Sequence, residues 1–426
     1  ERLIDSICAF DYPRELMEIQ VLDDSDDETV KLVDERVAYY QEQGYHIECT
    51  RREKRQGYKA GALRDAMPQV KGEFIAIFDA DFVPEPDFLR KTIPHFAQSD
   101  VGVVQTRWEH INQDYSLITR LQALQLNVHF TIEQQGRESG SYMLQFNGTA
   151  GVWRKETIED AGGWHDDTLT EDLDLSMRAQ LKGWKIVYLE EVGSPAELPA
   201  EMNGFKSQQY RWMKGGAETA RKMLPTIWKA GIPLRQKLHA TLHLLGSTVF
   251  VFVFMLGVLS VPLLFALRAL ELDARIFSGF IIGTLSIAVV YFIGNVTNPY
   301  TNPDRHLLRD ILKFLVMFPL FLAMSMGLSF HNTIAVMQGY IGKRSAFVRT
   351  PKYAIRSLTD SIKRKKYLSH HFSWTILLEG LLCLYFGFAI FVGMQIGDYS
   401  LIIFHILLVI GYGAIFYFSV KHLTYK

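Results

Sequence analysis

Two carboxylates two positions apart follow a short apolar run in the first quarter of the chain. Asp79 and Asp81 come directly after residues 75–78, whose side chains are typical of a buried strand. Carboxylate oxygens are preferred ligands of Mg²⁺ and Mn²⁺, and these ions commonly complete their shell with substrate phosphates. The pair predicts a divalent-cation site, although a strand-end turn with solvated acids would show the same pattern.

A second acidic motif, Thr170-Glu171-Asp172, opens a predicted helix over residues 173–181. A threonine before a helix is a common N-cap, and acids in the first turn interact favourably with the helix dipole. The motif also suits a chemical role, in which Asp172 is a general base that takes a proton from an acceptor hydroxyl. The two roles are compatible with one geometry.

A third segment combines cationic and aromatic side chains on one predicted helix. Its motif is Gln208, Arg211 and Trp212, and the flanking cations are Lys206, Lys214, Arg221 and Lys222. Arg211 could hold a diphosphate, and Trp212 could stack on a sugar ring. An amphipathic helix resting on a membrane surface has the same composition.

A fourth segment, residues 347–352, lies in a strongly basic loop. Residues 343–366 carry nine Lys or Arg against the single Asp360. Such runs commonly tether a protein to anionic lipid, and the positive-inside rule places this loop in the cytosol. Lys59, which is flanked by Gly57 and Gly61, is a further candidate cation, with a solvated helix start as the alternative.

The first half of the chain, which must position these residues, alternates predicted strands and helices. The strands are predicted at residues 19–22, 46–49, 74–78, 101–105, 142–146 and 185–189, and the main helices at residues 29–43, 87–96 and 115–135. This alternation predicts an α/β domain with a mostly parallel sheet and helices on both faces. Ligands of such sheets bind beyond the carboxyl ends of the strands. Asp23 and Asp24 stand at one such end, and Asp79 and Asp81 at another.

Charge divides the chain into two halves. The whole chain has 426 residues, of which 48% are hydrophobic, and a formal net charge of -1. Residues 1–238 hold 29 Lys or Arg against 39 Asp or Glu, whereas residues 239–426 hold 16 against 7. The apolar content excludes a disordered chain, and three widely spaced cysteines exclude a disulfide framework.

The second half contains four charge-free stretches long enough to cross a bilayer. They are residues 241–267, 276–303, 380–397 (extended by 374–378) and 399–420. A very hydrophobic soluble core is the alternative. A fifth stretch, 314–342, contains Pro319 and several polar residues, and we interpret it as a helix along the inner membrane interface, whole or broken. Two crossings then place the basic loop and the first half on the cytosolic side, whereas a span in the fifth stretch would invert this topology.

The order of the motifs is more specific than any one of them. D-D, K-A-G, D-A-D, T-E-D, Q-x-x-R-W and F-x-x-T-x-K follow one another before and among the predicted spans. In this order the sequence resembles the processive, membrane-embedded enzymes of glycosyltransferase family 2, which include cellulose and hyaluronan synthases. The likeness is strongest to cellulose-synthase-like glucomannan and mannan synthases and runs from about Cys8 to about Lys352. It includes whole phrases at residues 19–25, 57–63, 78–88 and 146–154.

The resemblance implies a GT-A fold beneath a membrane channel and an inverting transfer from a nucleotide-sugar. It makes Asp172 the catalytic base and gives Asp79 and Asp81 the divalent metal, Mg²⁺ or Mn²⁺. The donor would be bound by Asp23, Asp24, Lys59, Asp79, Asp81, Gln208, Arg211, Thr350 and Lys352. The acceptor would contact Trp212, Glu171, Asn147, Gly148 and Trp164. The segment from Phe347 to Lys352 resembles a gating loop, although Arg349 stands where related synthases usually have valine.

The roles implied by the resemblance agree with the chemistry of displacement at an anomeric carbon. One base acts on the acceptor side, while a metal and an arginine stabilise the leaving diphosphate. Glycoside hydrolases need a flanking pair of carboxylates instead.

The resemblance also divides the chain into regions. These are a cytosolic GT-A domain (1–202), interfacial amphipathic helices (203–238), two transmembrane helices (239–297), an interfacial helix with the gating loop (298–372) and two further transmembrane helices (373–420). The chain begins at Glu1 with a helical pattern, so we expect a first strand, and with it an upstream membrane helix, before that residue. The expected location is the inner or plasma membrane, crossed several times, with the GT-A domain in the cytosol.

The predicted function is polymerisation: a hexosyl unit moves from a UDP- or GDP-hexose to a growing β-linked polysaccharide that passes through the membrane helices. The main alternative is a non-processive enzyme with a ceramide or isoprenoid-phosphate acceptor. The gating loop and the aromatic side chains Trp153, Trp164 and Trp212 favour the polymerase. A non-catalytic transporter or scaffold is a third possibility, which the intact motifs disfavour. No nucleic-acid partner is expected. Likeness to mannan synthases points to GDP-mannose, and the wider family to UDP-glucose or UDP-N-acetylglucosamine.

Overall fold

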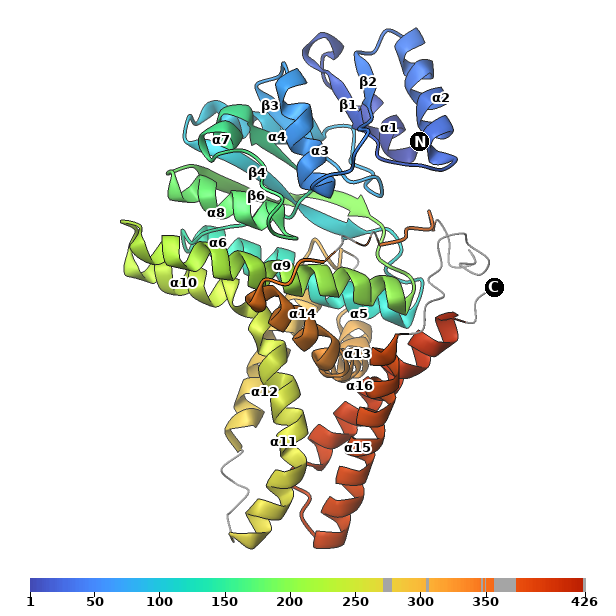
Figure 1. The fold of residues 1–426 in the computed structure, drawn as a ribbon, viewed down its shortest axis with the longest axis vertical. Coiled ribbons are helices and arrows are strands. Elements are labelled where there is room, and N and C mark those ends of the chain that lie inside the picture. The colour runs from blue at the N-terminus through green and yellow to red at the C-terminus, as the bar shows by residue number, and fades with distance from the viewer. Residues whose placement is uncertain (271–277, 304–305, 346–347, 349, 356–372, 424–426) are drawn as a thin grey trace. The chain divides into compact units, whose positions relative to one another are not determined.

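The computed structural model describes residues 1–270, 278–303, 306–345, 348, 350–355 and 373–423 (Figure 1). The chain divides into two compact units. Unit 1 comprises Glu1–Ile111, Glu133–Glu197 and Glu218–Leu244, and unit 2 comprises Asn112–Ile132, Leu198–Ala217 and Leu245–Lys426. Phe347, Arg349 and most of the predicted basic loop lie outside the described residues.

A small β-α-β arrangement opens unit 1. Strand β1 (Ile19–Leu22) pairs in parallel with β2 (Ile47–Thr50), and α2 (Thr29–Glu42) connects them. Val33 and Val37 are one helical turn apart and are buried with Ile4 and Cys8 of α1 (Arg2–Cys8). Because β1 and β2 are parallel, their carboxyl ends lie at the same edge.

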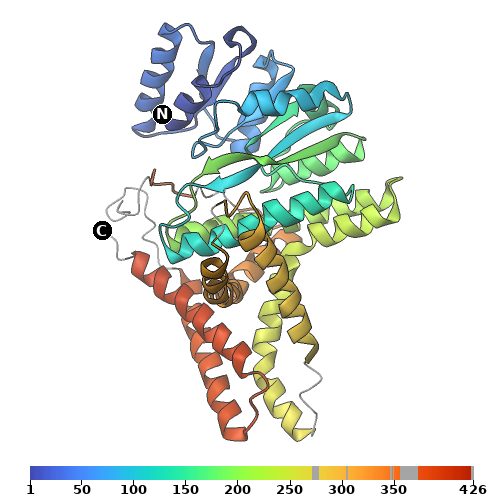
Figure 2. The same ribbon diagram turned by 180° about the vertical axis from the view of Figure 1, so that it is seen from behind.

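A second sheet of unit 1, which Figure 2 shows from behind, has the strand order β3-β5-β4-β6. Its strands are β3 (Phe74–Ile77), β4 (Val101–His110), β5 (Gly151–Arg154) and β6 (Lys185–Ala196). β5 is antiparallel to both of its neighbours, whereas β4 and β6 are parallel. The predicted α/β class is confirmed, with a sheet that is mixed.

Side chains pack against both faces of this sheet. Neighbouring residues of β5 point to opposite faces, and all four residues of this strand are buried. Val152 packs with Val104 against Phe88 of α4 (Phe88–Thr92). On the other side, the ring of Trp153 lies against Phe146 and Trp164. The remaining α-helices of unit 1 are α3 (Tyr58–Ala66), α6 (Gln135–Ser139), α7 (Lys155–Asp160), α8 (Glu171–Leu181), α10 (Leu234–Leu244) and the part of α9 (Met202–Lys229) from Glu218 onward.

The strand predicted at residues 142–146 is absent, and this prediction is wrong. The amide of Leu144 donates to Oε1 of Gln180 at 2.9 Å, and the amide of Phe146 donates to Oγ of Ser176 at 2.9 Å. Both acceptors are side chains of α8, so they replace a neighbouring strand as hydrogen-bond partners. The pairing with β3 and β4 is made instead by β5, a few residues later.

Unit 2 is helical. Its described helices are α5 (Leu117–Val128), the first part of α9 (Met202–Lys229), α11 (Val249–Ala269), α12 (Ser278–Phe292), α13 (Leu307–Gly327), α14 (Ser329–Ile341), α15 (Trp374–Ile396) and α16 (Ile402–Leu423). Among the described residues, three helices are long and apolar enough to cross a membrane: Gly246–Ala269, α15 and α16. The apolar helix over Ile282–Thr297 is shorter.

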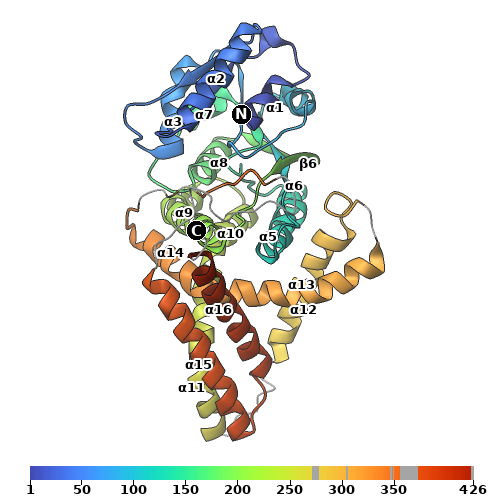
Figure 3. The ribbon, with the colours of Figure 1, turned by 90° about the vertical axis from the view of Figure 1, so that its right-hand side faces the viewer.

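Close backbone contact joins α13 to α16, and α15 runs beside α16 (Figure 3). A side chain on Gly411 would meet the backbone oxygen of Ala323, and one on Gly327 would meet the backbone of Gly411. Small residues at such crossings let two helices approach closely, as is common in membrane bundles.

The fifth apolar stretch forms two helices and not one. α13 ends at Gly327, α14 begins at Ser329, and the two are bent by 47°. By length and composition the pair suits a broken span or a re-entrant segment. Pro319 lies inside α13, away from the break. The interfacial placement of this segment stays a prediction.

Candidate active site

Lys59 connects three segments of unit 1. It lies in the first turn of α3, after Gly57, whose positive φ of 72° allows the sharp helix entry. Its Nζ is 2.5 Å from Oδ1 of Asp79, which follows β3, and donates to the backbone oxygen of Gly148 at 2.8 Å. Burial alone would lower the pKa of Lys59, but the carboxylates of Asp79, Glu171 and Asp172 outweigh it and raise that pKa. The ammonium therefore stays charged.

Gly148 also borders Asp172. Its φ is +80°, and a Cβ added there would lie 3.0 Å from Oδ2 of Asp172 and 3.8 Å from Nζ of Lys59. Glycine is the residue that adopts this backbone conformation without strain and leaves this space open. The structure thus brings together four of the predicted site residues, namely Lys59, Asp79, Gly148 and Asp172.

Asp172 lies in the first turn of α8, where its Oδ1 accepts a hydrogen bond from the amide of Leu173 at 2.9 Å. Desolvation raises the pKa of Asp172, and the neighbouring Glu171 carboxylate raises it further, to about 7. Such a carboxylate suits proton abstraction near neutral pH. Thr170 does not cap α8 with its side chain; its hydroxyl lies 3.1 Å from that of Thr219.

Asp23 and Asp24 are each paired with an arginine at the end of β2. Asp23 lies 2.9 Å from Arg51, and Asp24 lies 2.6 Å from Arg52. Burial by itself raises the pKa of Asp23, but hydrogen bonds from Ser25 and the charge of Arg51 outweigh it and hold that pKa below its usual value. The sequence motifs do not predict that these arginines pair with the acidic residues. A signal exists, because both arginines directly follow a strand that is parallel to β1, so they lie at the same sheet edge as the acidic pair.

Arg52 links this acidic pair to the helix that carries Lys59. Besides Asp24, it donates to the backbone oxygens of Gln56 and Tyr58, both at 2.9 Å. The end of β1 and the start of α3 are therefore joined by one guanidinium, whose planar fork can reach several acceptors.

The carboxylates of Asp79 and Asp81 fit a metal that arrives with a substrate phosphate. The side chain of Asp79 is 44% exposed, although it contacts Lys59. Among the described residues, the group of three ligands with metal-like spacing lies elsewhere, at His165, Asp167 and Asp174. Mg²⁺ is commonly held by one or two carboxylates plus phosphate oxygens, which this pair can supply.

The predicted acceptor residues of unit 1 are held by the core. The amide of Asn147 donates to Gln105 at 2.8 Å, and its side-chain oxygen accepts from Gln145 at 2.7 Å. Trp164 is only 3% exposed, and its ring centroid lies 5.7 Å from that of Trp153. Trp153 is fully buried and offers no face to a ligand. An acceptor contact of Trp164 stays a prediction.

Unit 2 brings two other predicted motifs together. Arg211 of α9 donates to the backbone oxygen of Val348 at 2.5 Å and to Oγ1 of Thr350 at 2.9 Å. The arginine of Q-x-x-R-W thus contacts the predicted gating segment. Oε1 of Gln208 is buried and has no hydrogen-bond partner among the described residues, so a ligand could satisfy it.

A cavity of about 260 Å³ lies beside Arg211 within unit 2, and most of the residues that line it have polar side chains. Its lining consists of Asn203, Lys206, Ser207, Tyr210, Arg211, His331, Val348, Ser373, Thr375 and Ile376. Lys206 forms a buried ion pair with Glu379 of α15, with N–O distances of 2.7 and 2.9 Å. Hydroxyls, an amide and an aromatic ring suit a hydroxyl-rich ligand.

Comparison with known families decides the membership of this chain. Residues 1–215 match the family model described as "Glycosyltransferase like family 2". The chain belongs to this family. The family predicted from the motif order is thereby confirmed.

Plant relatives match about half of this family member. It is 46% identical over 242 residues to glucomannan 4-beta-mannosyltransferase 1 of Oryza sativa subsp. japonica, covering 53% of this chain and 46% of the relative. It is 44% identical over 239 residues to probable glucomannan 4-beta-mannosyltransferase 10 of Arabidopsis thaliana, covering 53% and 43%. The matched region is less than half the length of these relatives.

A solved structure is also similar to this family member. It is the mannosyltransferase PcManGT from Pyrobaculum calidifontis in complex with GDP-Man and Mn²⁺. The match covers 74% of this chain and 82% of that one, with 20% identity and a TM-score of 0.48.

Proposed function

We propose that this family member is an inverting glycosyltransferase that extends a β-linked glycan, with a GT-A domain in unit 1 and Asp172 as the base. The observation that carries the proposal is the cluster of Asp172, Gly148, Lys59 and Asp79. A carboxylate with a raised pKa stands there beside a cation and a second, exposed carboxylate. The glucomannan mannosyltransferases that match at 44–46% identity support the same chemistry.

The proposed reaction is a single displacement. The acceptor hydroxyl gives its proton to Oδ2 of Asp172 while its oxygen attacks the anomeric carbon. The bond between that carbon and the phosphate oxygen breaks, and the nucleoside diphosphate leaves with the bonding pair. Lys59 places positive charge where negative charge develops, and Arg211 is proposed to bind the same diphosphate. A Mg²⁺ or Mn²⁺ ion on Asp79 and Asp81 would supply further charge stabilisation when bound.

For the donor, we propose GDP-mannose. The relatives named as 4-beta-mannosyltransferases support a mannosyl unit, and the acidic pair Asp23 and Asp24 is proposed to face the nucleoside. Arg51 and Arg52 hold these two carboxylates in place. Gln208, Thr350 and Lys352 complete the proposed donor set, and Trp212 and Glu171 the proposed acceptor set.

We further propose that the growing glycan leaves through unit 2 and that the protein crosses a bilayer several times. Three helices among the described residues that are long and apolar enough to span, and the cavity beside Arg211, support this proposal. Leu234, Leu238 and Leu242 form an exposed stripe along α10, with spacing of four, as expected for a helix at a membrane surface. Unit 1 is proposed to face the cytosol, in an inner or plasma membrane.

A donor panel tests the proposed function. The purified protein in lipid nanodiscs is incubated with radiolabelled GDP-mannose, GDP-glucose, UDP-glucose or UDP-N-acetylglucosamine, and the products are sized. We expect a ladder of growing chains from GDP-mannose. One added sugar that is extractable into organic solvent would instead indicate a lipid acceptor. No transfer from any donor would contradict a catalytic role.

A further inference from the structure

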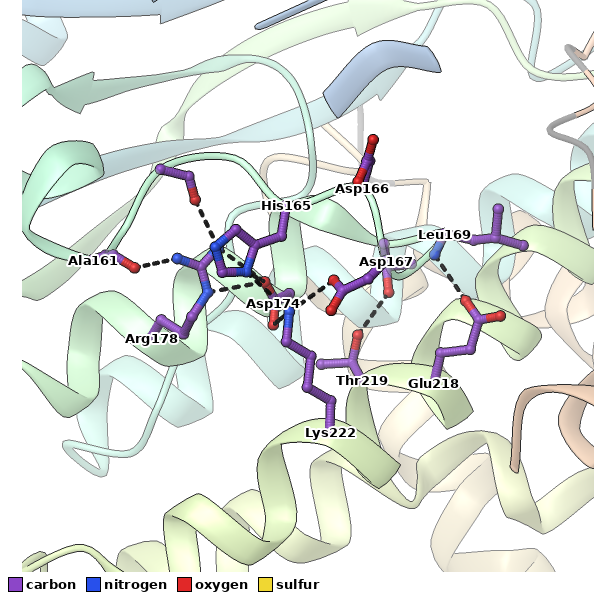
Figure 4. A network of polar contacts seen from close by, with 12 residues as sticks. Ala161, His165, Asp166, Asp167, Leu169, Asp174, Arg178, Glu218, Thr219 and Lys222 are labelled. Atoms are coloured by element: carbon purple, nitrogen blue, oxygen red, sulfur yellow. Dashed lines mark hydrogen bonds and ion pairs between the residues drawn. The ribbon is translucent and has the colours of Figure 1, made fainter. Parts of the chain in front are cut away.

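The segment that leads into α8 is held by the second part of α9, from Glu218 onward (Figure 4). Both elements belong to unit 1. The segment contains Thr170, Glu171 and Asp172, the proposed catalytic motif, but none of the side chains that hold it is part of that motif.

Lys222 of α9 provides the centre of this contact. Its ammonium lies 2.7 Å from Oδ1 of Asp167, 3.0 Å from Oδ1 of Asp174 and 3.1 Å from Nδ1 of His165. The contacts with Asp167 and His165 are hydrogen-bond contacts, whereas the contact with Asp174 is an ion pair. Asp174 is completely buried and is also paired with Arg178 at 2.9 Å, so its charge is neutralised from two sides.

The same three acceptors have the spacing of a metal site, since their ligand atoms lie within 4.8 Å of one another. Lys222 already places a cation among them. A divalent ion would have to displace this ammonium and would meet the Arg178 guanidinium beside Asp174. The geometry therefore favours an internal side-chain cation over a bound metal.

Two further contacts reach Leu169 and Thr170, which precede Asp172 by three and two residues. Oε2 of Glu218 accepts a hydrogen bond from the amide of Leu169 at 2.9 Å, and the hydroxyl of Thr219 lies 3.1 Å from that of Thr170. Glu218, Thr219 and Lys222 lie on one face of α9, since positions four apart are neighbours on a helix. Together they fix the segment on both sides of its entry into α8.

We infer that Lys222, supported by Glu218 and Thr219, is a positioning residue for Asp172. This inference rests on the proposed function, because it gives the position of the base a catalytic meaning. A misplacement of about 1 Å at a reacting group can cost roughly 100-fold in rate.

Hydrogen exchange measured by mass spectrometry tests the inference without relying on activity. In Lys222→Met, the amides of residues 165–175 should exchange at least about tenfold faster than in the wild type, because the segment loses its central cation. Lys229→Met is the matched control: it removes the same charge from an exposed position on the same helix, and exchange in the segment should not change. If Lys222→Met does not fold, Glu218→Ala replaces it and should expose the Leu169 amide.

Kinetics of the same variants complete the test. Lys222→Met and Lys222→Ala should lower kcat at least about tenfold and leave the Kd of the donor within about twofold, and methylammonium should restore part of the kcat of Lys222→Ala. Unchanged exchange and unchanged kcat would overturn the inference. So would a loss of donor affinity with kcat intact. Faster exchange in a protein whose wild type transfers no sugar would instead contradict the proposed function and leave the structural support standing.

Discussion

Gly148 and Asp172 lie so close that a single added Cβ on the glycine would stand 3.0 Å from the carboxylate oxygen Oδ2. The backbone oxygen of the same glycine accepts a hydrogen bond from Lys59. The open space in front of the proposed base therefore depends on a residue without a side chain. This contact connects residues 146–149 (F-N-G-T), whose residue types do not indicate a role, to the T-E-D motif.

Gly148→Ala should strongly reduce activity while the protein stays folded. The new methyl group would crowd Asp172 and Lys59, and φ of +80° costs an alanine roughly 1–2 kcal/mol. We expect transfer to fall at least about tenfold, measured as kcat/KM with the preferred donor.

Gly44→Ala is the control that separates the backbone strain of an alanine at positive φ from the crowding of Asp172 and Lys59. Gly44 has a φ of +81°, and nothing lies within 4 Å of the position that a Cβ would occupy, so alanine has the same backbone cost there at an open site. Equal losses of activity in the two variants would show that Gly148 matters only for folding.

The rate of transfer should depend on pH with an acidic limb near neutrality. Asp172 must be deprotonated to accept a proton, and its pKa is raised to about 7 by desolvation and by Glu171. kcat/KM should therefore increase as the pH rises through about 7 and fall below it. Glu171→Gln removes the neighbouring negative charge and should move the limb to lower pH. If the acidic limb of the pH–rate profile stays at the same pH in Glu171→Gln, Glu171 is not a cause of the raised pKa of Asp172.

Removal of divalent metal should stop transfer. EDTA should abolish activity, and Mg²⁺ or Mn²⁺ should restore it, because the carboxylates of Asp79, which is 44% exposed, and Asp81 are proposed to share the ion with the donor phosphates. Asp81→Asn should increase the metal concentration needed for half-maximal rate. Full activity after exhaustive EDTA treatment would remove the metal role of both residues.

The ion pair between Lys206 and Glu379 should be essential for the stability of unit 2. The two side chains are 6% and 0% exposed, so Glu379→Gln leaves a buried ammonium without its anion. Breaking a buried pair in this way costs about 3–5 kcal/mol. Thermal unfolding in detergent should show a large decrease in Tm. Asp398→Asn, at a partly exposed position of the loop after α15, keeps the side-chain oxygen that accepts from the Ser400 amide and should change Tm far less.

A double variant completes that comparison. Lys206→Met combined with Glu379→Leu removes both charges, and apolar replacements of buried pairs are often neutral. If the double variant is as unstable as Glu379→Gln, the charge pair is not the cause of the loss.

Much of the fold follows from local patterns in the sequence. β1, β2, β3, β4 and β6 are predictable because each combines an apolar, β-branched run with flanking turn residues. Residues 142–146 have the same local pattern, yet Ser176 and Gln180 satisfy their backbone groups. Because those partners lie some 30 residues away in the sequence, no local signal separates this segment from a strand.

The candidate site is predictable where residue type alone indicates chemistry, as in D-A-D and T-E-D. Site roles for Arg51, Arg52 and Lys222 do not follow from the sequence, because their contacts depend on which segments the fold brings together. In the sequence, Lys222 is visible only as one cation of a basic helix. Its three acceptors come from a segment about 50 residues earlier, which the spacing of the sequence does not reveal.

The most direct test of the central claim is the Asp172→Asn variant, measured for donor binding and for transfer in the same preparation. Asparagine keeps the shape of the side chain but cannot take the proton of the acceptor hydroxyl at neutral pH. We expect transfer to fall by at least about 100-fold while the Kd for GDP-mannose stays within about threefold of the wild type. Transfer at a rate comparable to the wild type would contradict the assignment of Asp172 as the base.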